Sequence, residues 1–172
     1  METPQLLADM QRAIGIGNGR FVVEATERGL LEEASAQDVV AAIHATGIEI
    51  AIDDFGTGYS SLAYLTTYPF DILKVDKSFT STACTEAVTS QVAIHIIELA
   101  RSLGMQTLVE GIETQEQADF FREKGVLYGQ GYFFGRPMRA EDLSAFVPLH
   151  TLPGQHATLQ SDANNKTAIT PD

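Results

Sequence analysis

The chain reads IDDFGTGYSSL over residues 52–62, and this stretch is the most informative pattern in the sequence. An apolar run, residues 48–52, ends in two adjacent carboxylates, Asp53 and Asp54, and a loop with two glycines follows. Neighbouring side chains of a strand point to opposite faces, but the twist at a strand end can bring both toward one site. The pattern therefore predicts a strand that delivers two carboxylates to a loop.

Two carboxylates in a small volume repel each other, which raises the proton affinity of one unless a cation neutralises them. Divalent cations such as Mg²⁺ take oxygen ligands. Asp53 and Asp54 are therefore candidate metal ligands. A solvated turn before a helix explains the same pair, so the two residues alone leave both interpretations open.

Composition limits the classes of protein and partner. The chain has 172 residues, 44% of them hydrophobic and 20% charged, which is typical of one soluble domain. The formal charge of −12 argues against DNA or RNA as a partner, because binding to nucleic-acid backbones requires clustered Lys and Arg. The same charge suits a site that attracts divalent cations.

Cysteine and hydropathy patterns predict the compartment. Cys84 is the single cysteine, so no disulfide can form within the chain, and a reducing compartment is expected. No apolar run is long enough to span a bilayer, and no signal peptide is recognisable at the start. These observations predict a cytoplasmic protein without a membrane segment.

Apolar runs and helical periodicities alternate along the chain. The predicted strands are 21–26, 48–53, 71–76, 105–110 and 126–130. The predicted helices are 3–16, 36–46, 60–67, 84–103, 114–124 and 140–146. This alternation indicates a parallel sheet covered by helices. Residues 149–172 are polar and predicted to be a disordered tail.

Each predicted strand has a polar side chain of a catalytic type at its C-terminal end: Glu24, Asp53 with Asp54, Lys74, Glu110 and Gln130. A barrel gathers its site from many strand ends, whereas a doubly wound open sheet binds ligands mainly at one switch point. Several separate contributors favour the barrel. A complete (β/α)8 barrel has eight strands, and this chain supplies five.

Five ordered motifs make the sequence similar to the EAL domain family, the cyclic di-GMP-specific phosphodiesterases. The motifs are EATE at 24–27, DDFGTGYSSL at 53–62, LKVDKSF at 73–79, VEGIET at 109–114 and GQGYFFGRPM at 129–138. The resemblance covers the C-terminal two thirds of the family's domain. It implies an α/β fold of the TIM-type (β/α)8 barrel, N-terminally truncated to about five β/α units. We expect a partial domain over 1–148, with the family's first three strands upstream of residue 1.

The resemblance implies hydrolysis of cyclic di-GMP to linear pGpG with two Mg²⁺ or Mn²⁺ ions. Glu24, Asp53 and Asp54 would be the metal ligands. Lys74 would hold and polarise the attacking water or the phosphate, and Glu110 would act as general base or as an outer ligand of the second metal. Two cations can neutralise a phosphodiester, generate the nucleophile and stabilise the leaving oxygen, which agrees with these roles.

Further residues are implied around the substrate and the metal ligands. They are Gln130, Glu27, Glu113, Asp76, Gly56, Thr57 and Gly58. Glu27 would support the loop 55–61, which the family uses to connect the active site to dimerisation. A homodimer is therefore also expected from the resemblance.

Three alternatives remain beside a phosphodiesterase. The first is a non-catalytic EAL-type module that binds cyclic di-GMP or a partner protein. The second is a fragment without independent function, and the third is an unrelated metal-dependent barrel enzyme such as an aldolase or an enolase-like lyase. Because the family's Glu-Ala-Leu motif and one further ligand lie upstream of residue 1, our hypothesis is that this chain alone is weakly active or inactive.

Overall fold

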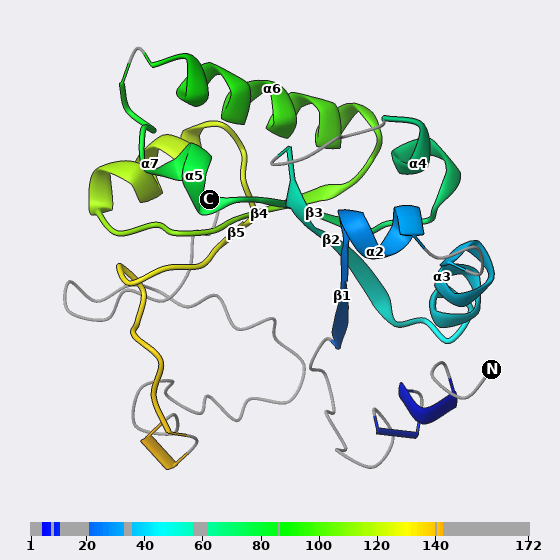
Figure 1. Cartoon of the computed structure of the whole chain (residues 1–172). Helices are drawn as coiled ribbons and strands as arrows, with labels where there is room; N and C mark the ends of the chain where they lie inside the picture. The colour runs from blue at the N-terminus through cyan, green and yellow to red at the C-terminus, as the bar shows by residue number, and fades with distance from the viewer. Residues whose placement is uncertain are drawn as a thin grey trace. The chain divides into compact units, whose positions relative to one another are not determined.

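The structure is a computed structural model that describes residues 5–7, 9–10, 21–32, 36–56, 62–85, 87–139 and 141–142. Its elements are β1 (Val22–Thr26), α2 (Glu27–Glu32), α3 (Ala36–His44), β2 (Glu49–Phe55), α4 (Leu62–Thr67), β3 (Ile72–Val75), α5 (Lys77–Thr80), α6 (Val88–Ser102), β4 (Gln106–Val109), α7 (Gln115–Glu123) and β5 (Tyr128–Gly129). Strands and helices alternate along the chain (Figure 1).

The strands form one sheet in the order β1-β2-β3-β4-β5. β1 pairs in parallel with β2, β2 with β3, and β4 with β5. Parallel neighbours need crossover connections, and the helices between the strands supply them. The predicted α/β architecture with a parallel sheet is confirmed.

Two compact units can be distinguished in the described chain. The first contains β1, α2, α3, β2, α4 and β3, together with the end of α6 and the start of β4. The second contains α5, the start of α6, the end of β4, α7 and β5. The boundary between the units therefore runs through one helix and one strand.

The core of the first unit lies on β2 and β3. Ile50, Ile52 and Leu73 are at most 1% exposed. α3 packs against β2 and buries Ala36, Val40 and Ile43, whose spacing of four and three residues places them on one helical face. The near-continuous burial of β2 and β3 is what a parallel strand covered on both faces requires.

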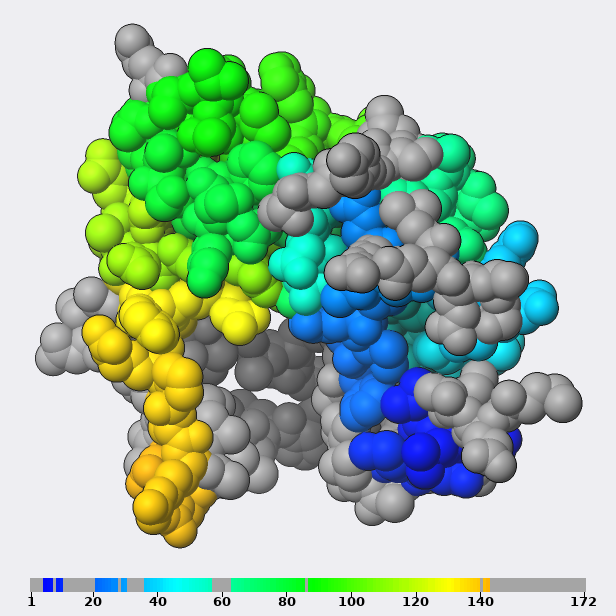
Figure 2. All heavy atoms as spheres, viewed as in Figure 1, coloured from blue at the N-terminus to red at the C-terminus, as the bar shows by residue number. Residues whose placement is uncertain are grey.

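The second unit packs around α7. Phe121 is fully buried, as are Val109 at the end of β4 and Ile112 in the following loop. After β5 the chain turns at 131–134 and continues without regular structure to Arg139. This segment is the arm coloured yellow to orange in Figure 2. The described residues of this arm beyond Gly135 are exposed up to Arg139.

The structure changes several predicted boundaries. The helix predicted from residue 84 begins only at Val88, because residues 81–85 form turns and Cys84 adopts a left-handed φ of 68°. The strand predicted over 126–130 is reduced to Tyr128–Gly129, the two residues that pair with β4. α2 and α5 were not predicted, since helices of six and four residues are too short for a clear periodicity.

Other predictions lie wholly or partly outside the described residues. The helix predicted over 3–16 is described at 5–7 and 9–10, which are helical, and the one over 140–146 at 141–142, also helical. The predicted tail, 149–172, lies outside the described residues. Among the helices that the structure describes, none combines the length and the apolar character needed to cross a bilayer.

Phe121 provides a test of the second unit's core. Because its side chain is fully buried, Phe121→Ala should lower the free energy of unfolding by about 3–5 kcal/mol, measured by urea titration. Tyr132→Ala is the control, since Tyr132 is 55% exposed and its truncation should change stability little. Equal effects of the two substitutions would contradict the described core.

Candidate active site

Strand register brings three of the predicted site residues to one face of the sheet. Glu24 is the register partner of Ala51 in β2, and Ala51 is the partner of Ile72 in β3. Residues two apart on a strand share a face, so Glu24, Asp53 and Lys74 emerge on the same side. Glu24 lies in the middle of β1 rather than at its end.

Lys74 forms ion pairs with both carboxylates. Its Nζ lies 2.8 Å from Oε2 of Glu24 and 2.9 Å from Oδ1 of Asp53. Lys74 is only 3% exposed, whereas the side chains of Glu24 and Asp53 are 50% and 21% exposed. A buried ammonium is costly unless it is paired, and these distances are those of charge-assisted hydrogen bonds.

The charges of this cluster do not cancel. One ammonium faces two carboxylates, which leaves a formal excess of one negative charge on a partly exposed surface. Carboxylate oxygens are the ligands that divalent cations prefer. Glu24 and Asp53 could therefore hold a cation such as Mg²⁺ or Mn²⁺, and this chemistry fits the predicted role of both residues.

Asp54 follows Asp53 in a left-handed conformation, with φ at 57°. Its backbone N–H donates to Oδ1 of Asp53 at 3.0 Å, and its side chain is exposed. Asp residues tolerate this conformation better than most others. The local backbone of Asp54 thus helps to fix the Asp53 carboxylate.

The remaining predicted residues of the first unit flank these strands. Glu27 is buried at the start of α2, Asp76 is half-buried directly after β3, and Gly56 is half-buried directly after β2. Thr57 and Gly58 lie outside the described residues. The structure thus describes the start of the predicted loop after β2 and not its remainder.

Three predicted residues belong to the second unit. Glu110 is half-buried directly after β4, Gln130 is exposed directly after β5, and Glu113 is exposed before α7. The backbone N–H of Gln130 donates to the carbonyl of Val109 at 2.8 Å, and its own carbonyl accepts from Ile112 N–H at 3.0 Å. These two bonds connect the backbone of Gln130 to the residue before Glu110 and to the residue two positions after it.

Close backbone contacts restrict this segment further. A Cβ added to Gly111, whose φ is 70°, would lie 2.5 Å from Cβ of Lys77. A Cβ added to Gly131 would lie 2.1 Å from the carbonyl oxygen of Ile112. Real Cβ atoms do not approach other atoms so closely, so both positions require glycine. The contact with Lys77 was not predicted, although the glycine itself was part of the VEGIET motif.

No group of three or more His, Cys, Asp and Glu side chains converges as a ready-made metal site within the described ranges. The paired carboxylates at Lys74 are the part of the predicted ligand set that the structure brings together. Asp54 does not join them in a described three-residue cluster. The part of the predicted ligand set that meets in the structure thus consists of two carboxylates, Glu24 and Asp53, paired with the ammonium of Lys74.

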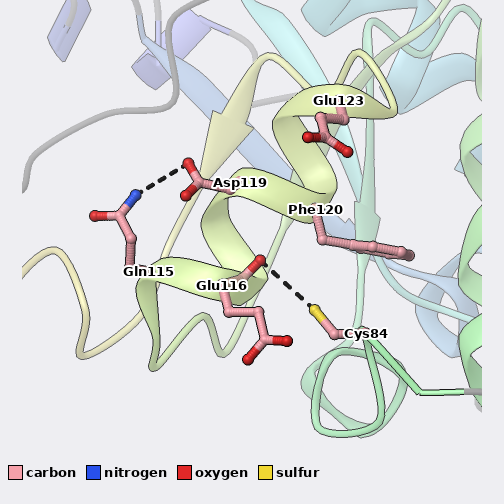
Figure 3. A pocket seen from close by; sticks show the side chains of 6 residues that line it. All are labelled: Cys84, Gln115, Glu116, Asp119, Phe120 and Glu123. Carbon is pink, nitrogen blue, oxygen red and sulfur yellow. Dashed lines mark hydrogen bonds between the residues drawn. The ribbon is translucent and has the colours of Figure 1, made fainter.

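A pocket of about 580 Å³ lies beside α7, lined by Cys84, Gln115, Glu116, Asp119, Phe120 and Glu123 (Figure 3). None of the predicted site residues lines it. The thiol of Cys84 donates to the carbonyl of Glu116 at 3.5 Å. Burial, and to a lesser extent the negative charge of Glu116, raises the pKa of the Cys84 thiol above its ordinary value. Because the thiolate is the nucleophile, Cys84 is expected to react more slowly than a free cysteine at neutral pH.

Lys74 can be tested by its contribution to stability. Lys74→Met removes the counter-charge of two carboxylates and should lower the free energy of unfolding by roughly 1–3 kcal/mol. Lys74→Arg keeps the charge and should lose less. Urea titration of the three proteins measures both effects, and a Met variant as stable as the wild type would contradict the ion pairs.

Cys84 can be tested by its reactivity toward a thiol reagent such as DTNB. The pH midpoint of the reaction should lie above that of free cysteine, because the raised pKa keeps the thiol protonated. Glu116→Gln removes the negative charge and should move this midpoint down. A wild-type midpoint at or below that of free cysteine would refute the raised pKa of Cys84.

Comparison with known proteins places this geometry in a family. A model of the EAL domain matches residues 1–137. An Escherichia coli (strain K12) protein with the name "Probable cyclic di-GMP phosphodiesterase PdeN" is 46% identical over 123 residues, which are 72% of this chain and 24% of that protein. The chain thus spans about a quarter of this relative's length.

Solved structures agree with the family match. The EAL enzyme Bd1971, in a form with cAMP and cyclic di-GMP bound, superposes with a TM-score of 0.73 at 34% identity, over 80% of this chain and 36% of that one. A manganese and cyclic di-GMP complex of Klebsiella pneumoniae BlrP1 gives a TM-score of 0.68 at 29% identity, over 77% and 34% of the chains. Both cover most of this chain, so the fold of the described residues is that of part of an EAL barrel. The chain belongs to the EAL domain family.

Proposed function

We propose that this chain carries part of the active site of a metal-dependent phosphodiesterase that hydrolyses cyclic di-GMP to linear pGpG. The observation that carries the proposal is the buried Lys74 paired with Glu24 and Asp53 on adjacent parallel strands. PdeN's name and the cyclic di-GMP in the Bd1971 complex support the choice of substrate.

Each residue has a task that its chemistry permits. Glu24 and Asp53, with Asp54, would hold two divalent cations, Mg²⁺ or Mn²⁺, and the manganese in the BlrP1 complex supports a divalent ion. Bound divalent cations supply charge neutralisation of the phosphodiester and a water that is more easily deprotonated. The Lys74 ammonium would attract the phosphate oxygens as a point charge and orient the substrate.

Glu110 would accept the proton of the attacking water. In the overall reaction the water oxygen bonds to phosphorus, the bond from phosphorus to the ribose 3′ oxygen breaks, and that oxygen takes up a proton. Gln130, Glu113 and Asp76 would support the substrate or the residues around it, as would Glu27 and the loop with Gly56, Thr57 and Gly58. We also propose that the protein is cytoplasmic and forms a homodimer. Analytical ultracentrifugation of the purified chain tests the dimer.

A second candidate is a module that binds cyclic di-GMP without hydrolysing it. The lack of a converging group of three ligands among the described residues favours this candidate, because two carboxylates hold a cation less tightly than three.

Hydrolysis distinguishes the two candidates. The purified chain is incubated with cyclic di-GMP and Mg²⁺ or Mn²⁺, and pGpG is followed by chromatography. We expect slow formation of pGpG that EDTA abolishes and that Glu110→Gln lowers by about 100-fold or more, since general-base catalysis contributes 10²–10⁴-fold.

The control is binding of cyclic di-GMP by calorimetry, with Glu110→Gln expected to retain it. Binding without pGpG from a cooperatively unfolding sample would replace the enzyme by the binding module. Absence of both binding and hydrolysis would overturn both candidates.

A further inference from the structure

The side chain of Gln117 in α7 connects three segments of the second unit. Its Oε1 accepts from the backbone N–H of Glu113 at 2.8 Å and of Thr114 at 3.2 Å. Its Nε2 donates to the carbonyl of Thr80, the last residue of α5, at 3.3 Å. Two N–H donors require the amide oxygen and a carbonyl requires the amide nitrogen, so the network itself determines the orientation of the amide.

Part of this arrangement is an ordinary helix cap. The hydroxyl of Thr114 accepts from the N–H of Gln117 at 3.2 Å, and the Gln117 side chain accepts from the N–H of Thr114, which completes a capping box. A capping box uses only the acceptor of the third residue, and glutamate serves there as well as glutamine. The bond to Thr80 is additional, and it needs a donor that glutamate lacks.

The segment that Gln117 holds follows Glu110 directly. Ile112 is fully buried, its N–H donates to the carbonyl of Gln130, and its carbonyl accepts from the N–H of Phe133, both at 3.0 Å. Gly111 packs so tightly on Lys77 of α5 that no side chain fits between them. The first residue of α5, Lys77, therefore contacts the start of segment 111–114 at Gly111. The last residue of α5, Thr80, is connected to the end of that segment through Gln117.

We propose that Gln117 is a positioning residue that locks α5 to the segment 111–114 and thereby fixes the carboxylate of Glu110 for proton transfer. The inference rests on the proposed function, in which Glu110 accepts the proton of the attacking water. Thr80 is completely buried, so water does not compete for the bond to its carbonyl. Misplacement of a catalytic group by about 1 Å lowers rates by about 100-fold, so a lock on the segment that directly follows Glu110 is expected to affect turnover.

Two substitutions separate the cap from the lock. Gln117→Glu keeps an acceptor for Glu113 and Thr114 but places a carboxylate oxygen against the carbonyl of Thr80, which breaks the lock alone. Gln117→Met removes both functions at similar volume. Gln115→Glu is the matched control, because it adds the same charge to the first turn of α7 and also loses an amide donor, here the bond to Asp119, while it leaves the contacts of Gln117 with Thr80, Glu113 and Thr114 in place.

Two measurements are made on the full chain. Hydrogen exchange followed by mass spectrometry reports on segments 77–84 and 110–114, and turnover of cyclic di-GMP gives kcat and KM. In Gln117→Glu, exchange in 77–84 should be about tenfold faster, with 110–114 still protected and kcat about 10- to 100-fold lower at nearly unchanged KM. Gln117→Met should accelerate exchange in both segments, whereas Gln115→Glu should change neither exchange nor kcat.

The outcomes separate the inference from the function on which it rests. Exchange in Gln117→Glu equal to that in Gln115→Glu would overturn the lock, whatever the activity. Faster exchange with unchanged kcat would overturn the positioning of Glu110. A wild-type chain that binds no cyclic di-GMP and forms no pGpG would overturn the proposed function, and the exchange rates would then still decide whether Gln117 ties α5 to 111–114.

Discussion

An ammonium group buried in a strand is stable only when anionic groups replace the water around it, and Lys74 meets this requirement with Glu24 and Asp53. The constraint acts in both directions. The two carboxylates would repel each other without a cation between them, and both of them stabilise the buried lysine. The pairing of β1, β2 and β3 therefore positions the site as well as the backbone. A change in their register by one residue would move these side chains to the opposite face.

The two units position their polar residues by different means. In the first unit, the polar side chains lie on parallel strands whose other residues are mostly apolar, and the register of the strands determines which polar side chains meet. In the second unit, Glu110 lies in a loop, and its surroundings are fixed by backbone hydrogen bonds and by glycines without room for a Cβ. Loops position side chains less exactly than strands do unless such contacts restrain them. Gln117 belongs to these restraints.

The pocket beside α7 shows why composition alone is a weak guide to chemistry. It combines a thiol, an aromatic ring and three carboxylates, a set that on paper would suit a nucleophile or a metal. The raised pKa of Cys84 argues against its use as a nucleophile. The cluster at Lys74, by contrast, contains fewer polar groups, but its two carboxylates lie at bonding distance from one buried ammonium. Distance and burial, rather than the number of acidic residues, distinguish the two places.

The linear sequence determined the alternation of strands and helices, because apolar runs of β-branched residues and helical periodicities are local patterns. It also singled out Glu24, Asp53 and Lys74 as candidates, because their motifs are contiguous, and the structure brings these three side chains together. Local patterns did not determine α2 and α5, which are too short for a period to appear, or the turn at Cys84, which delays the start of α6. The ion pairs of Lys74 depend on the register of three strands, and the bond from Gln117 to Thr80 joins residues 37 positions apart. Such contacts arise only when the chain is packed, since local patterns in the sequence do not determine which distant residues meet.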